Sequence, residues 1–272
     1  MEKLLFFHGG PGLNSNPEKQ MLSSLYEQQG VILCTWNEPS GLRNTLSASG
    51  NQTRFEQLLQ SAEDFLLMHF EGDGIAVAGH SMGCQIVAWL MQRHNDKIKT
   101  AFMIAPCFHL YTSDRSVFNF IADDFKKYNN PAAHEKMSTV LNNISGRFDD
   151  NAVAGWQLAL SNLHLFNFYW SDSRLQEAYL SYFTAPQFTV DAESFFAVRR
   201  SYYPPAPVQN DGKVVVIYAS FDRVMSMEED FPLIKNKFPC NTVYTFENHT
   251  HFIHIEEAQA VSEIIAREIR SL

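Results

Sequence analysis

Residues 74–91 read GIAVAGHSMGCQIVAWLM, in which a Gly-x-Ser-x-Gly pattern separates two apolar runs. The first run has the length of a buried strand, and the second has the length and composition of a helix. So tight a turn from strand to helix strains the backbone of its central serine and requires small residues two positions before and after it. We therefore predict that Ser81 is a nucleophile exposed at the end of a strand. An isolated match of this kind would also suit a serine in an ordinary glycine-rich turn.

A second motif, HGGPG at residues 8–12, follows a short apolar run at residues 3–7. Glycine lets a backbone N–H approach a substrate carbonyl closely because it has no Cβ. Acyl transfer needs two N–H donors for the oxyanion, one from the residue after the nucleophile and one from the loop after the first core strand. These donors are predicted to be Met82 and Gly10. The alternative is a Gly-Pro turn that only reverses the chain.

The other members of a catalytic triad are expected in the order serine, acid, histidine. Asp222 comes shortly after the most β-branched run of the chain, residues 213–219, and so lies past the carboxyl end of a predicted strand, where active-site loops gather. The loop after the last predicted strand contains His249 and His251, and His254 follows. We predict Asp222 as the acid and His251 as the base. His249 and His254 remain alternative bases, and Asp222 would otherwise be an ordinary turn residue.

Strand-like and helix-like runs alternate through most of the chain. The expected strands are residues 3–7, 31–36, 74–78, 98–105, 214–219 and 242–246. The expected helices between and after them are residues 16–29, 53–70, 84–91, 228–237 and 256–270. This alternation predicts an α/β fold with a mostly parallel sheet of about six strands covered by helices.

Strand signals vanish in the middle of the chain, where helices are expected at residues 116–128, 132–141, 152–161, 172–182 and 192–203. We predict a core formed by residues 1–106 and 208–272, with a helical cap insertion at residues 107–207. The insertion is rich in aromatic residues, and Trp156, Phe168 and Trp170 are predicted to line an apolar pocket above the nucleophile. The same rings would also suit the small internal core that such an insertion needs.

These motifs together resemble the α/β-hydrolase superfamily, over most of the chain outside the insertion. HGGPG is similar to the oxyanion motif of the proline iminopeptidase group, and the elbow and residues 251–257 resemble those of many esterases and C–C-bond hydrolases. Two departures argue against aminopeptidase specificity: Met82 stands where those peptidases usually have Trp, and residues 37–41 read NEPSG in place of an Asp-Gln-Arg-Gly loop.

The triad predicts a serine hydrolase that cleaves a small, largely apolar ester or amide through an acyl-enzyme intermediate. Three alternatives remain: a C–C-bond hydrolase with the same triad, an aminopeptidase like the proline iminopeptidases, and a non-catalytic binding protein of this fold. We expect no cofactor. We also expect no metal ion, because the histidines near the C-terminus lack a metal-binding motif.

The expected partner is a small-molecule ester or amide substrate, and the composition disfavours two other classes of partner. The formal net charge is −9 and the pI is about 5.5, which disfavours nucleic acid and anionic membranes. The first residues lead directly into a predicted strand, and no apolar run approaches the ~20 residues of a membrane span, so we expect a cytoplasmic enzyme without a signal peptide. Members of the superfamily usually carry a hairpin before the glycine-rich loop. Its expected absence leaves an exposed strand edge, which predicts a covering loop or a homo-oligomer contact there.

Overall fold

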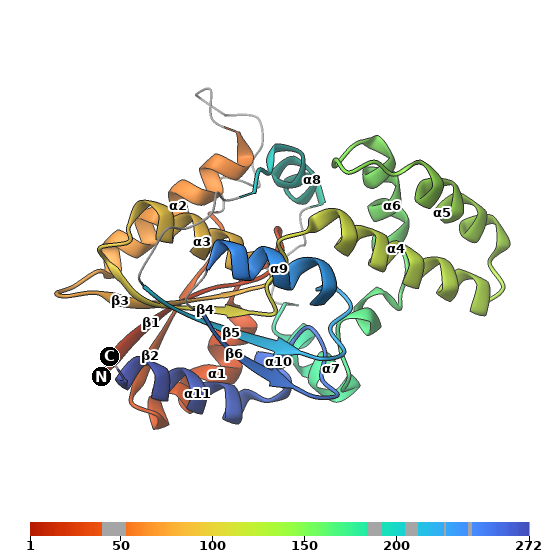
Figure 1. Ribbon diagram of the computed structural model, residues 1–272. Helices are drawn as coiled ribbons and strands as arrows, with labels where there is room; N and C mark the ends of the chain where they lie inside the picture. The colour runs from red at the N-terminus through yellow and green to blue at the C-terminus, as the bar shows by residue number, and fades with distance from the viewer. Residues whose placement is uncertain (40–52, 184–191, 205–211, 226, 239–240, 272) are drawn as a thin grey trace.

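A computed structural model describes residues 1–39, 53–183, 192–204, 212–225, 227–238 and 241–271 (Figure 1). Its centre is a six-stranded sheet in which every neighbouring pair of strands is parallel. In spatial order the strands are β2 (Val31–Trp36), β1 (Glu2–Phe7), β3 (Ile75–His80), β4 (Ile98–Ile104), β5 (Lys213–Ala219) and β6 (Asn241–Phe246). The predicted parallel sheet of about six strands is confirmed.

Both faces of the sheet are buried, which explains why its inner strands read as continuous apolar runs. In β1, Leu5 and Phe7 pack into the core on one face, whereas Leu4 and Phe6 pack into the core on the other. This alternation follows from the two-residue period of a strand. The strand β2, and not β1, forms the edge of the sheet on this side, and a homo-oligomer contact along an edge stays a prediction.

Helices cover the two faces as separate layers (Figure 1). One layer contains α2 (Arg54–His69), α3 (Gly83–Arg93) and α9 (Met227–Lys237). The other contains α1 (Asn16–Gln28), the short α10 (Ile253–Glu256) and α11 (Ala258–Arg270). Helix α2 begins at a capping box, in which the Thr53 and Glu56 side chains each bond the other residue's backbone N–H.

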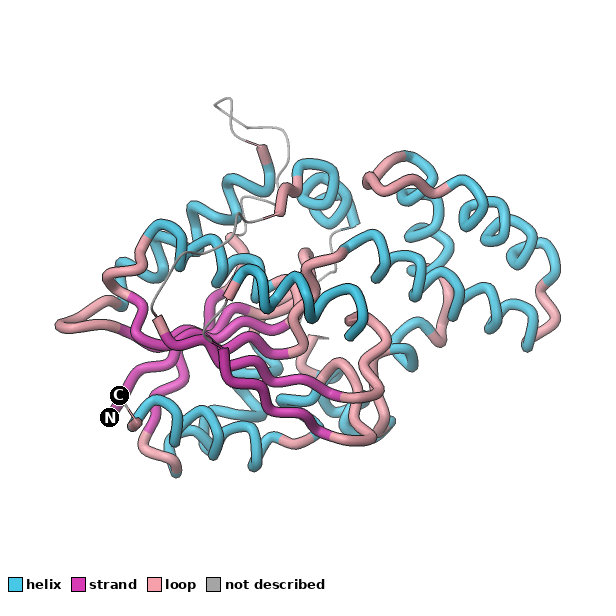
Figure 2. The backbone as a smooth tube through the Cα atoms, in the orientation of Figure 1, coloured by secondary structure: helices cyan, strands magenta, loops and turns pink. Residues whose placement is uncertain are grey.

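The chain between β4 and β5, here called the helical segment, lies beyond the carboxyl ends of the strands (Figures 1 and 2). Its described elements are α4 (Leu110–Lys127), α5 (Pro131–Asn143), α6 (Asp150–Leu160), the 3-10 helix η2 (Leu165–Phe168), α7 (Ser173–Ser181) and α8 (Ala192–Ser201). Helices α4, α5 and α6 share an apolar core of their own. The cap boundaries at residues 107 and 207 stay a prediction, and residue 207 lies outside the described residues.

Candidate active site

Ser81 lies in the turn between β3 and α3. Its φ is +54°, a left-handed conformation that is unusual for a residue with a side chain. The Ser81 N–H donates to the carbonyl of Ile104 in β4 over 3.0 Å, and the Cys84 N–H donates to the Ser81 carbonyl over 3.0 Å. These bonds hold the turn that aims the half-buried Ser81 at a cavity above the sheet.

This turn requires glycine at two positions, because a side chain at either would clash with backbone atoms. A Cβ on Gly79 would lie 2.4 Å from the backbone of Gly83, and a Cβ on Gly83 would lie 2.1 Å from the carbonyl oxygen of Phe7. Backbone atoms in a parallel sheet cannot move aside as the end of a flexible side chain can. The Gly-x-Ser-x-Gly pattern is therefore a packing requirement of the strand-to-helix turn.

The HGGPG loop lies between β1 and α1, and Gly10 has a φ of +108° that favours glycine. The Glu38 carboxylate accepts two hydrogen bonds from the Gly12 N–H, at 2.9 Å and 3.1 Å, and so holds the loop against the end of β2. Gly10 and Met82 both line the cavity beside Ser81. Met82 directly precedes α3, where the helix dipole favours negative charge.

Asp222 and His251 come together from loops after β5 and β6. Asp222 Oδ2 accepts a hydrogen bond from His251 Nδ1 over 2.9 Å, and both side chains are buried. Asp222 Oδ1 accepts from the backbone N–H groups of Val224, at 2.8 Å, and Met225, at 3.3 Å, which orients the carboxylate. A proton on Nδ1 leaves Nε2 of His251 as the basic nitrogen.

The other two histidines have different partners. His249 contacts Glu257 through Nε2 over 3.0 Å and lies 3.7 Å from Glu256. His254 is buried beneath the site with its Nε2 3.6 Å from Glu18. Of the three candidates, the structure brings His251 to Asp222 and to the cavity that Ser81 lines.

His8, His80 and His254 are here called the buried histidine cluster; His80 lines the cavity, and His8 and His254 are not among the residues that line it. All three are almost completely buried, and the rings of His80 and His254 lie 4.2 Å apart. Burial lowers the pKa of each below the ordinary histidine value, most strongly for His80, where the neighbouring His254 and His251 add to the effect. The cluster is therefore held in the uncharged form.

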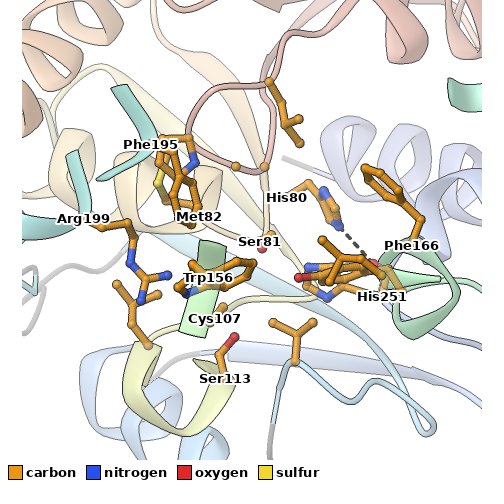
Figure 3. A pocket seen from close by; sticks show the side chains of 18 of the residues that line it. His80, Ser81, Met82, Cys107, Ser113, Trp156, Phe166, Phe195, Arg199 and His251 are labelled. Atoms are coloured by element: carbon orange, nitrogen blue, oxygen red, sulfur yellow. Dashed lines mark hydrogen bonds between the residues drawn. The ribbon is translucent and has the colours of Figure 1, made fainter. Parts of the chain in front are cut away.

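His80 also reaches His251 directly, because its Nε2–H donates to the backbone carbonyl of His251 over 2.9 Å (Figure 3). The residue in front of Ser81 is thereby tied to a residue 171 positions later. The sequence prediction used His80 only as a position in the elbow pattern. No local signal could have found this contact, since it joins the last residue of β3 to a distant loop.

The loop that contains His251 is held on its outer side by Glu256. This carboxylate accepts from the N–H and hydroxyl of Thr250, at 2.9 Å and 2.8 Å, and from the N–H and hydroxyl of Ser171, both at 2.7 Å. Burial opposes ionisation of Glu256, but these hydrogen bonds outweigh it and lower its pKa. The Tyr169 carbonyl oxygen lies 2.9 Å from the Thr250 hydroxyl, which shares its one proton between this carbonyl and Glu256, so the helical segment touches the His251 loop directly.

The cavity above Ser81 has a volume of about 440 Å³ and lies between the sheet and the helical segment. Figure 3 shows Ser81 near its centre, with His251 on one side and Arg199 on the other. Most of its walls are apolar, with contributions from Leu110, Trp156, Leu160, Leu165, Phe166 and Phe195. A cavity of this size and character suits a small organic molecule.

The three aromatic residues predicted to contact substrate have different positions. Trp156 lines the cavity. Phe168 and Trp170 do not line it: Phe168 packs in the core of the helical segment, and Trp170 stacks on Phe252 with ring centroids 4.3 Å apart. Phe168 thus contributes to the internal core of the segment, whereas Trp170 packs into the core on one face of the sheet.

Two further features concern the chain as a whole. In the part of the chain that the structure describes, no three His, Cys, Asp or Glu side chains are grouped so that they could hold a metal ion. The described helices include none that is both long and apolar enough to cross a membrane.

Comparison with solved structures finds the same architecture in several enzymes. A bromoperoxidase from Bacillus anthracis matches with a TM-score of 0.67 and 14% identity, over 99% of this chain and 92% of that chain. An esterase from Exiguobacterium antarcticum matches with a TM-score of 0.64 and 11% identity, over 99% and 92%. A structure from work on carboxylesterases of Nitrososphaera gargenis matches with a TM-score of 0.64 and 17% identity, over 99% of this chain and 90% of that chain. At such low identities these similarities establish the fold alone.

The sequence family is also established. A model of the alpha/beta hydrolase fold family matches residues 3–258, which is nearly the whole chain. A comparison with functionally curated proteins gives no match. The chain belongs to the α/β-hydrolase fold family, as its elbow and glycine-rich loop predicted.

Proposed function

We propose that this protein is a serine hydrolase that cleaves a small, largely apolar ester or amide through an acyl-enzyme intermediate. The observation that carries the proposal is the 2.9 Å hydrogen bond between Asp222 and His251 at a cavity that Ser81 also lines. A fold kept only for binding has no need of a buried carboxylate and imidazole paired beside a strained serine.

In the first half of the proposed reaction, His251 Nε2 takes the proton of the Ser81 hydroxyl as its oxygen attacks the substrate carbonyl. The carbonyl oxygen becomes an oxyanion, which the N–H groups of Gly10 and Met82 stabilise; loss of one such donor costs roughly 3 kcal/mol in the transition state. The imidazolium of His251 then gives its proton to the leaving alcohol or amine as the bond to the acyl carbon breaks. Asp222 stabilises the imidazolium without being protonated.

In the second half, a water molecule gives a proton to His251 Nε2 and attacks the acyl carbon. The new oxyanion collapses, the bond to Ser81 breaks, and the proton returns from His251 to the serine oxygen. The products are a carboxylic acid and the free enzyme. In this mechanism the helical segment acts as a cap that covers the acyl group and limits the entry of other water.

The apolar cavity favours a substrate that has no ammonium group beside the scissile bond, unlike a peptide with a free amino terminus. An aminopeptidase must hold an ammonium group, and carboxylates do this best. Among the described residues that line the cavity, none is Asp or Glu. This observation supports an esterase or an amidase rather than an aminopeptidase.

Labelling with a fluorophosphonate probe tests the proposal, because such probes modify only an activated serine. We expect the wild type and Ser113→Ala to be labelled and Ser81→Ala to remain unlabelled; Ser113 is a matched control, since it lines the same cavity. Equal labelling of Ser81→Ala would identify another nucleophile. Absence of labelling in every protein would favour a binding protein.

A substrate panel then separates the remaining alternatives. p-Nitrophenyl esters of short acids report esterase activity, amino-acid anilides report aminopeptidase activity, and diketones report C–C-bond hydrolysis. We expect the esters to be turned over fastest, and the Ser81→Ala protein to lose turnover of all three. Faster cleavage of the anilides or the diketones would replace the proposed specificity with that of the corresponding alternative.

A further inference from the structure

The cavity contains a buried cation that the triad does not use. Arg199 on α8 lines the wall, and its side chain is only 8% exposed. Among the described lining residues it is the only arginine or lysine. Its Nη2 donates to Asp114 Oδ2 over 2.6 Å, and Asp114 Oδ1 accepts from Trp156 Nε1 over 2.9 Å.

The surroundings of Arg199 leave part of its guanidinium for a ligand. A guanidinium donates only in its own plane, through five N–H groups. The ring centroids of Phe148 and Phe195 lie 4.7 Å and 5.9 Å from its central carbon, and its Nη2 is already bonded to Asp114. Its Nε is buried without accessible surface, so a ligand in the cavity does not touch that atom. Nη1 has no hydrogen bond to the residues that the structure describes, so its N–H groups are the donors left for a ligand oxygen in the cavity.

The charge of the site indicates what kind of oxygen this is. The Asp114 carboxylate already neutralises Arg199, and both groups are buried. A carboxylate ligand would place a second negative charge beside the same guanidinium, away from water, which is unfavourable. An uncharged oxygen accepts a guanidinium N–H bond without adding charge. The site therefore favours a neutral acceptor.

The position of Arg199 indicates which part of the substrate carries this oxygen. The leaving group must receive its proton from His251, so it lies on the His251 side of Ser81. Figure 3 shows Arg199 on the opposite side of Ser81. The acyl part of the substrate therefore extends toward Arg199.

We propose that the Arg199 guanidinium binds an uncharged oxygen, a keto, hydroxyl or ether oxygen, on the acyl chain of the substrate. The proposal rests on the proposed hydrolase function and names its substrate class: apolar acyl esters or amides with one internal oxygen acceptor. Arg199 then determines specificity, and it takes no part in the acyl transfer itself.

The test uses p-nitrophenyl octanoate, its oxo derivatives with the keto group at successive carbons from 4 to 7, and the p-nitrophenyl monoester of the dicarboxylic acid of equal length. Dissociation constants are measured by calorimetry with Ser81→Ala, and kcat/KM is measured with the wild type. We expect one oxo position to improve both quantities by at least about tenfold over the plain octanoate, the effect of a hydrogen bond to a charged donor. The carboxylate ester is expected to gain nothing.

Variants of the pair locate the effect. Arg199→Met combined with Asp114→Asn removes both charges together, so that neither is left buried alone, and is expected to abolish the oxo preference. Asp114→Asn alone leaves the guanidinium uncompensated and is expected to strengthen binding of the carboxylate ester. Arg200→Met is the matched control: Arg200 is the next residue of α8, is exposed and pairs with the exposed Asp150, so the preference should persist.

The proposal would be overturned by any of these results: no oxo position favoured in binding or turnover, a preference that survives in the double variant, or a wild type that favours the carboxylate ester. A Ser81→Ala protein that binds none of the esters would also overturn it. Failure of the proposed function looks different, because the esters would then bind to Ser81→Ala with the expected preference while the wild type releases no p-nitrophenol.

Discussion

Replacement of His80 by leucine is expected to slow the proposed reaction without weakening substrate binding. His80 Nε2 donates to the carbonyl of His251 over 2.9 Å, and the His80 ring packs 4.8 Å from the ring of His251. Leucine fills a similar space but donates no hydrogen bond. Glutamine is also of similar size and carries an N–H that can reach the same carbonyl. The pair His80→Leu and His80→Gln therefore isolates the hydrogen bond.

The magnitude follows from the contacts. An uncharged hydrogen bond contributes about 1 kcal/mol to stability, and a buried carbonyl left without a partner costs about 1–3 kcal/mol. We expect His80→Leu to lower the free energy of unfolding by about 2 kcal/mol. The backbone of His251 also loses its inner support, and a shift of the base by about 1 Å lowers kcat by roughly 10- to 100-fold. KM should change little, because leucine keeps the volume of the part of the cavity wall that His80 forms, and the lost hydrogen bond is to His251 rather than to the substrate.

The assay is p-nitrophenyl ester hydrolysis, with kcat and KM measured separately and urea unfolding measured in parallel. His254→Leu is the control for packing: His254 is equally buried in the same cluster, but the structure gives it no hydrogen bond to the base loop. We expect His254→Leu to lose stability and to retain kcat, and His80→Gln to recover most of kcat. Wild-type kcat in His80→Leu, or equal losses in the leucine and glutamine variants, would refute the positioning role.

Two further predictions concern stability. Burial holds the pKa values of the buried histidine cluster below the ordinary value of 6.5. Below that pH the unfolded chain therefore binds more protons than the folded chain. The free energy of unfolding consequently falls as the pH decreases. Urea unfolding at several pH values should show this slope, and His254→Gln should reduce it by up to ~1.4 kcal/mol per pH unit; an unchanged slope contradicts the assignment. Gly83→Ala places a Cβ 2.1 Å from the Phe7 carbonyl oxygen and should cost at least ~3 kcal/mol in thermal unfolding. Gly146→Ala, whose Cβ meets nothing within 4 Å, should change stability by less than about 0.5 kcal/mol, and equal effects would contradict the steric argument.

The elbow and the sheet can be predicted from sequence because their signals are local. Gly79 and Gly83 are required by atoms within the turn and by the neighbouring strand β1, and the requirement appears as a five-residue pattern. The inner strands β1, β3, β4 and β5 are buried on both faces, so each reads as a short, mostly apolar run. The predicted strand ranges consequently agree with the structure to within about two residues at each end, as is usual for such boundaries.

Other features depend on contacts between distant residues. The sequence predicted a helix from residue 116, whereas α4 begins at Leu110. The N–H groups of Phe108 and His109 donate to Asp230 Oδ1, over 3.3 Å and 2.9 Å, and so hold the chain directly before the helix. This partner lies 121 residues away from His109 in the sequence, and no local pattern near residue 110 indicates it.

The same reasoning explains which pocket residues escaped prediction. Composition shows that the helical segment is rich in aromatic rings but not which ring faces the cavity, since Trp156 and Trp170 are equally suited to either position. Arg199 gives no sequence signal, because its partner Asp114 lies 85 positions earlier on another helix. Both assignments require the packing of one helix on another, which depends on tertiary structure.

The proposed catalytic groups differ in what positions them. Steric limits within the elbow place Ser81, and backbone N–H groups of its own loop orient Asp222. The loop of His251 depends instead on side chains from other elements, His80 inside and Glu256 outside.

The outer support of this loop also includes the helical segment, because Thr250 donates to the Tyr169 carbonyl and Ser171 donates to Glu256. A displacement of residues 169–171 would therefore shift the base while leaving the nucleophile and the acid in place. Ser81, Asp222 and the glycine loop are set by the α/β core, whereas the alignment of His251 is shared between the core and the helical segment. In the proposed mechanism, the contacts that place the base therefore include the segment that covers the substrate.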